Sequence, residues 1–119
     1  MYKTRPFSRL AKKAGLTDDA LKDAVGEMRK GIIHADLGGS VYKQRVALPG
    51  RGKRGGSRVV IAANLQDRWI FVHCYLKGDQ ANISPDEEYV FKEFARVYME
   101  LSGEMIQTAV ERGVLEVIV

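Results

Sequence analysis

VYKQRVALPGRGKRGGSRVVIAANLQDRWIFVHCYLK, residues 41–77, is the stretch that decides the fold. It holds three segments rich in β-branched and aromatic residues, at 41–48, 58–64 and 69–77, with short polar links between them. Links this short join neighbouring antiparallel strands, because a parallel pair needs a long crossover connection. The stretch therefore predicts the centre of an antiparallel sheet.

The two links differ in chemistry. Residues 49–56, PGRGKRGG, carry four glycines and three cations, and this composition predicts a flexible basic hairpin tip. The segment lacks the spacing of a phosphate-binding P-loop and precedes a strand, where a P-loop precedes a helix, so nucleotide binding is not expected. Residues 65–68 predict a tighter turn around Gln66 and Asp67.

Helical patterns flank the strands on both sides. Residues 1–15 predict a short first helix, and a second helix begins at a Thr17 cap and ends before Gly31. Ser84, Pro85 and Glu87 form a capping box with proline at the first helical position, which starts a third helix. This helix breaks near residues 102–103, before another helix at 104–112 and a short terminal strand within 114–119.

These patterns predict an α+β fold. We expect a small antiparallel sheet of three to five strands, with the N-terminal helices packed on one face and one or two C-terminal helices. The chain has 119 residues and 45% hydrophobic side chains, which suits one domain over residues 1–119. A single cysteine, with no apolar run of membrane-spanning length and no signal-peptide layout, predicts a cytoplasmic, reduced protein that does not bind membranes.

Positive charge is concentrated in the middle of the chain. The net charge is only +4, but no acidic residue lies between Asp36 and Asp67. That interval holds six cations: Lys43, Arg45, Arg51, Lys53, Arg54 and Arg58. A field of this sign attracts phosphate groups and weakens with salt, so the expected partner is a polyanion.

Four of the cations are expected on one surface of the sheet. Alternation along a strand puts Lys43 and Arg45 on the same face, and Arg58 begins the next strand. Lys77 ends the third strand on the parity of Phe71, His73 and Tyr75, which are expected to share its face. Fixed cations on a rigid sheet suit RNA cleavage by the ribose 2′-hydroxyl, because negative charge develops on the phosphorane oxygens. The plainer interpretation is a solvated strand face, and composition alone supports only anion binding.

The remaining reactive side chains are weaker candidates. His73 is either a proton donor in a cleft or a half-buried strand residue, and Tyr75 can stack on a base or donate its hydroxyl. His34 and His73 have no further ligand at metal-binding spacing, so neither a zinc site nor any other cofactor is expected. Cys74 lies in an apolar run and is given no role beyond packing.

Residues 37–84 resemble the RelE/HigB toxin family of the RelE/ParE superfamily. The resemblance rests on the Gly-Gly pair at 38–39, the Lys-x-Arg strand, the loop closing in Gly-Gly-x-Arg, an aromatic strand ending in lysine, and Asn-Ile-Ser before a helix. It implies a type II toxin that cleaves messenger RNA on the ribosome, without metal. The implied partners are a cognate antitoxin, expected to carry a helix-turn-helix domain, and the ribosome with its message.

The resemblance also implies roles for individual residues. Lys43 or Arg45 is the implied base, Arg58 stabilises the transition state, and Lys77 protonates the leaving group or contacts phosphate. The wider RNA-binding surface is expected to include Arg51, Lys53, Arg54, His73 and Tyr75. Two positions depart from some family members, since Gly78 and Ile83 stand where those enzymes have arginine and tyrosine. The leaving-group acid is therefore open, with His73 or Tyr75 as substitutes.

Two other functions remain open at this stage. One is a toxin like the ParE branch, which poisons DNA gyrase and does not need the cation set. The other is a basic RNA-binding module without catalysis. Primer extension on a translated message separates the three, because only a ribonuclease leaves new 5′ ends within codons.

Overall fold

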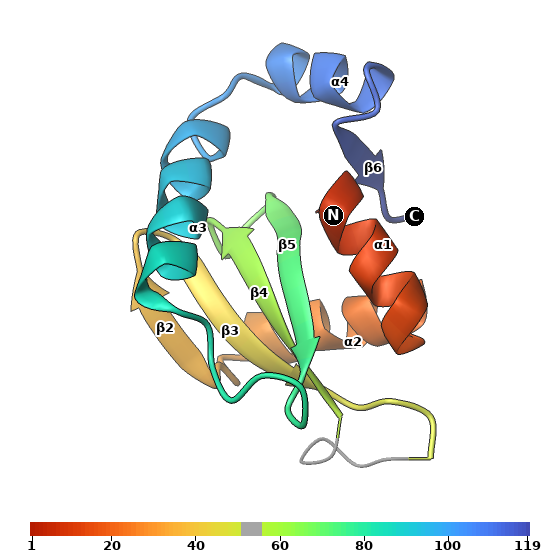
Figure 1. Cartoon of the computed structure of the whole chain (residues 1–119). Coiled ribbons are helices and arrows are strands. Elements are labelled where there is room, and N and C mark those ends of the chain that lie inside the picture. The colour runs from red at the N-terminus through yellow and green to blue at the C-terminus, as the bar shows by residue number, and fades with distance from the viewer. Residues whose placement is uncertain (51–55) are drawn as a thin grey trace.

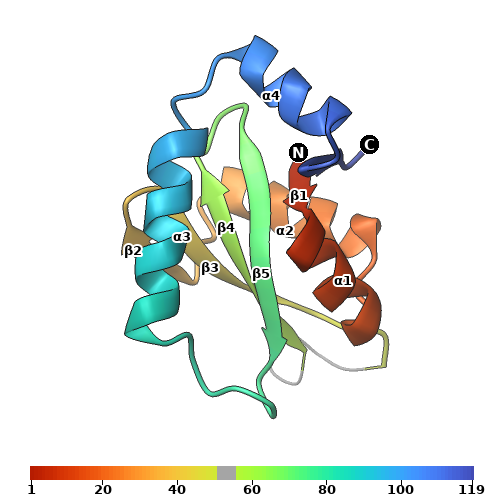
Figure 2. The ribbon, with the colours of Figure 1, turned by 45° about the horizontal axis from the view of Figure 1, so that its top comes forward.

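The computed structural model describes residues 1–50 and 56–119. Along these residues run β1 Tyr2–Thr4, α1 Arg5–Ala14, α2 Asp18–Arg29, β2 Ala35–Gly38, β3 Val41–Val46, β4 Ser57–Ala63, β5 Trp69–Leu76, α3 Pro85–Tyr98, α4 Gly103–Glu111 and β6 Leu115–Val117. The strands form one sheet in the order β2-β3-β4-β5-β1-β6 (Figure 1). Figure 2 shows α2 behind the central strands, α3 in front of them and α1 beside β5.

The α+β class is confirmed, but the expected sheet is corrected in two respects. The described residues form six strands, more than the three to five predicted. The sheet is also mixed, because β1 pairs in parallel with β5 while the other pairs are antiparallel. The central antiparallel strands β3, β4 and β5 are those that residues 41–77 predicted.

The additional N-terminal strand explains the parallel pair. Residues 2–4 were expected within a first helix, but they form β1 between β5 and β6. The Thr4 side chain then caps α1 by accepting a hydrogen bond from the Phe7 amide at 3.3 Å, and Pro6 lies in the first turn. A three-residue strand is too short to show alternation, so the pattern of the following helix concealed it. The short C-terminal strand is confirmed as β6.

Strand β2, at the other edge of the sheet, also escaped sequence analysis. Its residues, Ala-Asp-Leu-Gly, have little β propensity, and they are held by side chains of their neighbour β3 and of the preceding bend. The buried Gln44 donates to the Ile32 carbonyl at 2.8 Å and accepts from the His34 amide at 3.1 Å. The Arg45 amide donates to His34 Nδ1 at 2.7 Å. These bonds fix the bend that leads into β2.

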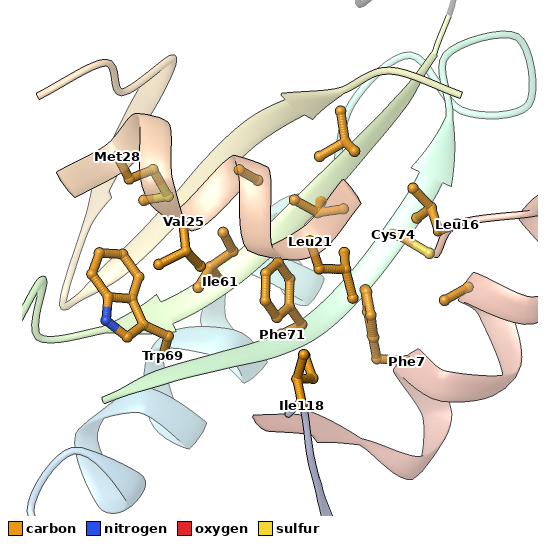
Figure 3. Close-up of a cluster of buried hydrophobic side chains, with 14 of the residues drawn as sticks. Phe7, Leu16, Leu21, Val25, Met28, Ile61, Trp69, Phe71, Cys74 and Ile118 are labelled. Carbon is orange, nitrogen blue, oxygen red and sulfur yellow. The ribbon is translucent and has the colours of Figure 1, made fainter. Parts of the chain in front are cut away.

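One face of the sheet is covered by α1 and α2. Their apolar residues pack against inward-facing side chains of β4 and β5, and Figure 3 shows Phe7, Leu21, Val25 and Met28 gathered over this face. The Phe7 and Phe71 ring centroids lie 5.4 Å apart. Each fully buried side chain of this kind contributes about 1.5–3 kcal/mol. This layer is the larger core and holds the central strands rigid.

The opposite face carries α3 and α4. Ala95 and Ile106 are buried against Val41, Val60 and Ile70 of the sheet, with aromatic residues of α3 packed around them. The predicted start of α3 is confirmed, since Ser84 and Glu87 make both bonds of the capping box. Helix α4 begins at Gly103, one residue before the expected start, because Ser102 caps it. This second helical layer covers only part of its face.

A bulge in β5 decides which side chains reach the uncovered part. Phe71 pairs with Ile61, whereas His73 pairs with Val60, so Val72 is an extra residue in the ladder. Phe71 therefore belongs to the core under α1 and α2, while His73 and Tyr75 face the other way. The expectation that Phe71 shares a face with His73 and Tyr75 is wrong, because simple alternation is broken at this point.

Candidate active site

The register of β3, β4 and β5 brings polar side chains into two rows on the face that α3 only partly covers. In the first row, Arg45 lies directly opposite Arg58, and Arg58 lies directly opposite Tyr75. In the second row, Lys43 and His73 lie on either side of one β4 residue. Paired residues point to the same side of a sheet. The structure thus brings three of the four predicted cations onto one surface, together with both aromatic candidates.

Arg58 stands at the centre of the first row and is the most enclosed of these cations. It is only 7% exposed, as is the neighbouring Tyr75, whereas Arg45 at the edge is exposed. Like charges placed directly opposite each other on adjacent strands destabilise a sheet. A buried arginine opposite a second arginine therefore indicates a surface shaped for an anion at some cost in stability.

The Lys43 side chain is held by a residue of a loop that lies outside the sheet. Its Nζ donates to Asn82 Oδ1 at 3.0 Å, and the same oxygen accepts from the Ile83 amide at 2.9 Å. Asn82 belongs to the loop between β5 and α3, which thus reaches across to β3. Sequence analysis noted the Asn-Ile-Ser run but gave Asn82 no role, since nothing in the sequence reveals that this loop contacts Lys43.

Sequence analysis also missed a carboxylate beside the cations. Glu87 Oε1 accepts hydrogen bonds from the Ser84 amide at 2.8 Å and from Gln80 Nε2 at 2.9 Å, while Oε2 lies 3.6 Å from His73 Nε2. The bond from the Ser84 backbone, with smaller contributions from Gln80 and the neighbouring His73, lowers the pKa of Glu87. The capping box located this residue on α3, but only the fold shows which strand it faces.

The His73 ring has two aromatic neighbours, Tyr75 on β5 and Phe91 on α3. The His73 ring centroid lies 5.9 Å from that of Tyr75 and 5.4 Å from that of Phe91, to which it is stacked. Burial raises the pKa of Tyr75, an effect opposed by Arg58 and assisted by Glu87. Tyr75 consequently keeps its phenolic proton at neutral pH and can act as a hydrogen-bond donor to an anion.

The other predicted residues lie at the rim or outside the described part. Lys77 follows the last residue of β5, in an exposed turn, and its side chain makes no hydrogen bond or ion pair with any residue that the structure describes. The loop cations Arg51, Lys53 and Arg54 lie outside the described residues. Lys77 can extend the surface along a bound polyanion, beyond the end of the first row.

The chemistry available at this site is the binding of phosphate and the transfer of protons. Arginine offers a planar fork of donors, lysine a compact charge, and the Tyr75 hydroxyl a neutral donor. Among residues 1–50 and 56–119, no group of three or more histidine, cysteine, aspartate or glutamate side chains is arranged to hold a metal ion. These features suit the binding of an RNA phosphate by side chains from several β-strands at once.

Cys74 lies on the far side of β5 and is buried in the core of α1 and α2. Burial raises the pKa of its thiol to about 11. Because only the thiolate is nucleophilic, we expect the native protein to react with a thiol reagent about a hundredfold more slowly at neutral pH than free cysteine does. The rate should rise to that of free cysteine in denaturant, and a fast reaction of the folded protein would contradict this placement.

Comparison with known families agrees with this geometry. The chain matches, over residues 1–118, the family model described as the RelE toxin of the RelE / RelB toxin-antitoxin system. The chain belongs to the RelE toxin family. The match spans the helices of both layers as well as the strands that carry the site. The comparison with curated proteins returned no match.

Membership in the RelE family has two direct consequences. This RelE toxin is the toxin component of a toxin-antitoxin system, and a cognate antitoxin is its partner. RelE-family toxins are generally endoribonucleases. None of the helices in the described part of the chain combines the length and apolar character needed to span a lipid bilayer.

Proposed function

We propose that this RelE toxin is a ribosome-dependent endoribonuclease that cleaves messenger RNA and so inhibits translation. The proposal rests above all on Arg58, a nearly buried cation between Arg45 and Tyr75 on a rigid sheet. The reaction is attack of a ribose 2′-hydroxyl on the adjacent phosphodiester. Protein side chains alone can supply the base, the charge stabilisation and the acid that this reaction requires.

We assign each residue of the two rows a separate role in the cleavage reaction. Lys43, in its amine form, accepts the proton of the 2′-hydroxyl, and Asn82 holds it in position. The Arg58 guanidinium donates hydrogen bonds to the non-bridging oxygens of the phosphate as negative charge develops on them. The Tyr75 hydroxyl is a further, neutral hydrogen-bond donor to the same oxygens. Arg45 and Lys77 bind flanking phosphates from the exposed ends. The loop cations Arg51, Lys53 and Arg54 are proposed to extend this RNA-binding surface.

The two alternative functions, a gyrase-poisoning toxin and a non-catalytic RNA-binding module, account for fewer features of the site. A gyrase-poisoning toxin has no requirement for a nearly buried arginine opposite a second arginine. A non-catalytic RNA-binding module is served by exposed lysines and arginines, which contact phosphates without burial. Neither explains why Arg58 is enclosed and why Lys43 is fixed by a loop residue. The ribonuclease accounts for both features.

Primer extension on a translated message tests the proposal. The purified toxin is incubated with the message alone, with ribosomes, and with ribosomes plus initiator tRNA. We expect discrete new 5′ ends within codons only when the message is being read. Cleavage of the message alone would contradict ribosome dependence, and gyrase-linked breaks in supercoiled DNA without RNA cleavage would favour the gyrase function.

The antitoxin is proposed to act by covering the cations. An acidic or helical segment laid across the two rows would be held by charge complementarity and would exclude RNA. We further propose that the antitoxin carries a helix-turn-helix domain and that the pair acts in the cytoplasm. Co-purification of the toxin with the product of the adjacent reading frame, and loss of cleavage in that complex, are the expected results.

A further inference from the structure

A chain of polar contacts crosses the site from Lys43 on β3 to His73 on β5. Glu87 Oε2 lies 3.6 Å from His73 Nε2, and Glu87 Oε1 accepts from Gln80 Nε2 at 2.9 Å. Gln80 Nε2 also donates to the Asn82 carbonyl at 2.8 Å, and the Asn82 side chain accepts from Lys43. The two ends of the chain, Lys43 and His73, are the members of the second row.

Glu87 is held in one orientation by the start of α3. Its Oε1 completes the capping box with Ser84, whose hydroxyl accepts from the Glu87 amide at 3.1 Å. With Oε1 occupied in this way, Oε2 is fixed toward β5. The helix cap therefore sets the direction of a carboxylate that faces the site, and the same residue serves both purposes.

His73 Nε2 faces Glu87 Oε2 at a distance slightly too long for a hydrogen bond. This nitrogen is buried and has no hydrogen-bond partner within the described residues, although the carboxylate is 3.6 Å away. The His73 side chain is 18% exposed and also lines an apolar groove of about 440 Å³ between α1 and α3. Catalytic contacts that are long in a free enzyme often tighten when substrate binds.

The charges around His73 oppose each other. Arg58 on β4 and Lys43 on β3 share its face of the sheet, and Arg5 of α1 lines the same groove. These cations disfavour an imidazolium, while Glu87 on α3 favours it. Tyr75, on β5 itself, stays neutral at physiological pH because its pKa is raised. The Glu87 carboxylate thus counters the cationic surroundings of the His73 ring.

We propose that Glu87 is a positioning residue that holds a proton on His73 Nε2 and so makes His73 the acid of the cleavage reaction. The inference rests on the ribonuclease function proposed above. The 2′-oxygen forms its bond to phosphorus, the bond from phosphorus to the 5′-oxygen breaks, and that oxygen takes the proton from His73 Nδ1. The products are a 2′,3′-cyclic phosphate and a 5′-hydroxyl. His73 is left neutral, with its remaining proton directed at Glu87.

Glu87→Gln is the variant that tests this assignment. Glutamine supports a capping box as glutamate does, so α3 should keep its start, which circular dichroism checks. We expect single-turnover cleavage of ribosome-bound message to slow about tenfold. We also expect the descending alkaline limb of its pH profile to move about one unit toward lower pH, because the imidazolium loses the carboxylate that stabilises it.

Two further measurements separate positioning from a merely structural effect. The NMR signal of the His73 ring, followed as a function of pH, should shift its midpoint in the Glu87→Gln protein by the same amount as the pH profile. His73→Gln should slow cleavage about a hundredfold, which is within the usual range for loss of a general acid. In that background, Glu87→Gln should add less than about a twofold effect, since the group it positions is absent.

Glu88→Gln is the matched control. It removes the same charge one residue along α3, where Glu88 pairs with Lys92 at 3.2 Å, and we expect it to change neither readout. A Glu87→Gln protein whose His73 midpoint and alkaline limb equal those of the wild type would overturn the inference while leaving the ribonuclease intact. A wild-type protein that never cleaves RNA would overturn the proposed function and this role with it.

Discussion

Arg58→Ala is expected to slow cleavage of ribosome-bound message by about a hundredfold to a thousandfold, the usual cost of removing one preorganised donor from a developing oxyanion. Arg58 is the central member of its row and is only 7% exposed. A charge in such surroundings acts more strongly on a phosphorane than the same charge in water. Growth arrest on expression should be lost together with cleavage.

The Arg58→Lys variant separates the contribution of the two parallel guanidinium hydrogen bonds from that of the positive charge. Lysine keeps the positive charge but cannot donate two parallel hydrogen bonds, so we expect about a tenfold loss, between the wild type and the alanine variant. Arg96→Ala is the matched control, because it removes an exposed α3 arginine that pairs with Glu93 at 3.0 Å. Equal activity of Arg58→Ala and Arg96→Ala in folded protein would refute the assigned role.

Much of the sheet and helix layout follows from local patterns. The alternation around Lys43 and Arg45, the glycine-rich link and the Ser84 capping box each depend on neighbours in the chain. These signals predicted the three central strands and the start of α3. They also led to the expectation that Lys43, Arg45 and Arg58 share one face, whereas the register that pairs Arg45 with Arg58 is given by the structure.

Features that depend on distant partners were not predictable. β1 exists because β5 and β6 flank it, and β2 because Gln44 and His34 hold the bend before it. The bulge at Val72 leaves no mark in the sequence, because the strand residues contain neither glycine nor proline. Glu87 appeared only as a helix cap, because its distance to His73 is set by how α3 packs on the sheet.

The bulge in β5 turns Phe71 into the core and away from the site, so we expect substitution of Phe71 to lower stability. Phe71→Ala should lower the free energy of unfolding by about 3–5 kcal/mol, the usual cost of removing a fully buried aromatic ring. Phe71 is 0% exposed and contacts Phe7 in the core under α1 and α2. Urea denaturation measures this change, and the slope of the transition should stay the same if the unfolding remains two-state.

Tyr75→Phe is the comparison that makes the test specific to the bulge. Tyr75 lies on the opposite face, so removing its hydroxyl should slow cleavage while changing stability by less than about 1 kcal/mol. Without the extra residue, both rings would belong to the same face by simple alternation. A Phe71→Ala protein of nearly wild-type stability with greatly reduced cleavage would place Phe71 in the site. That result would contradict the register on which the two rows depend.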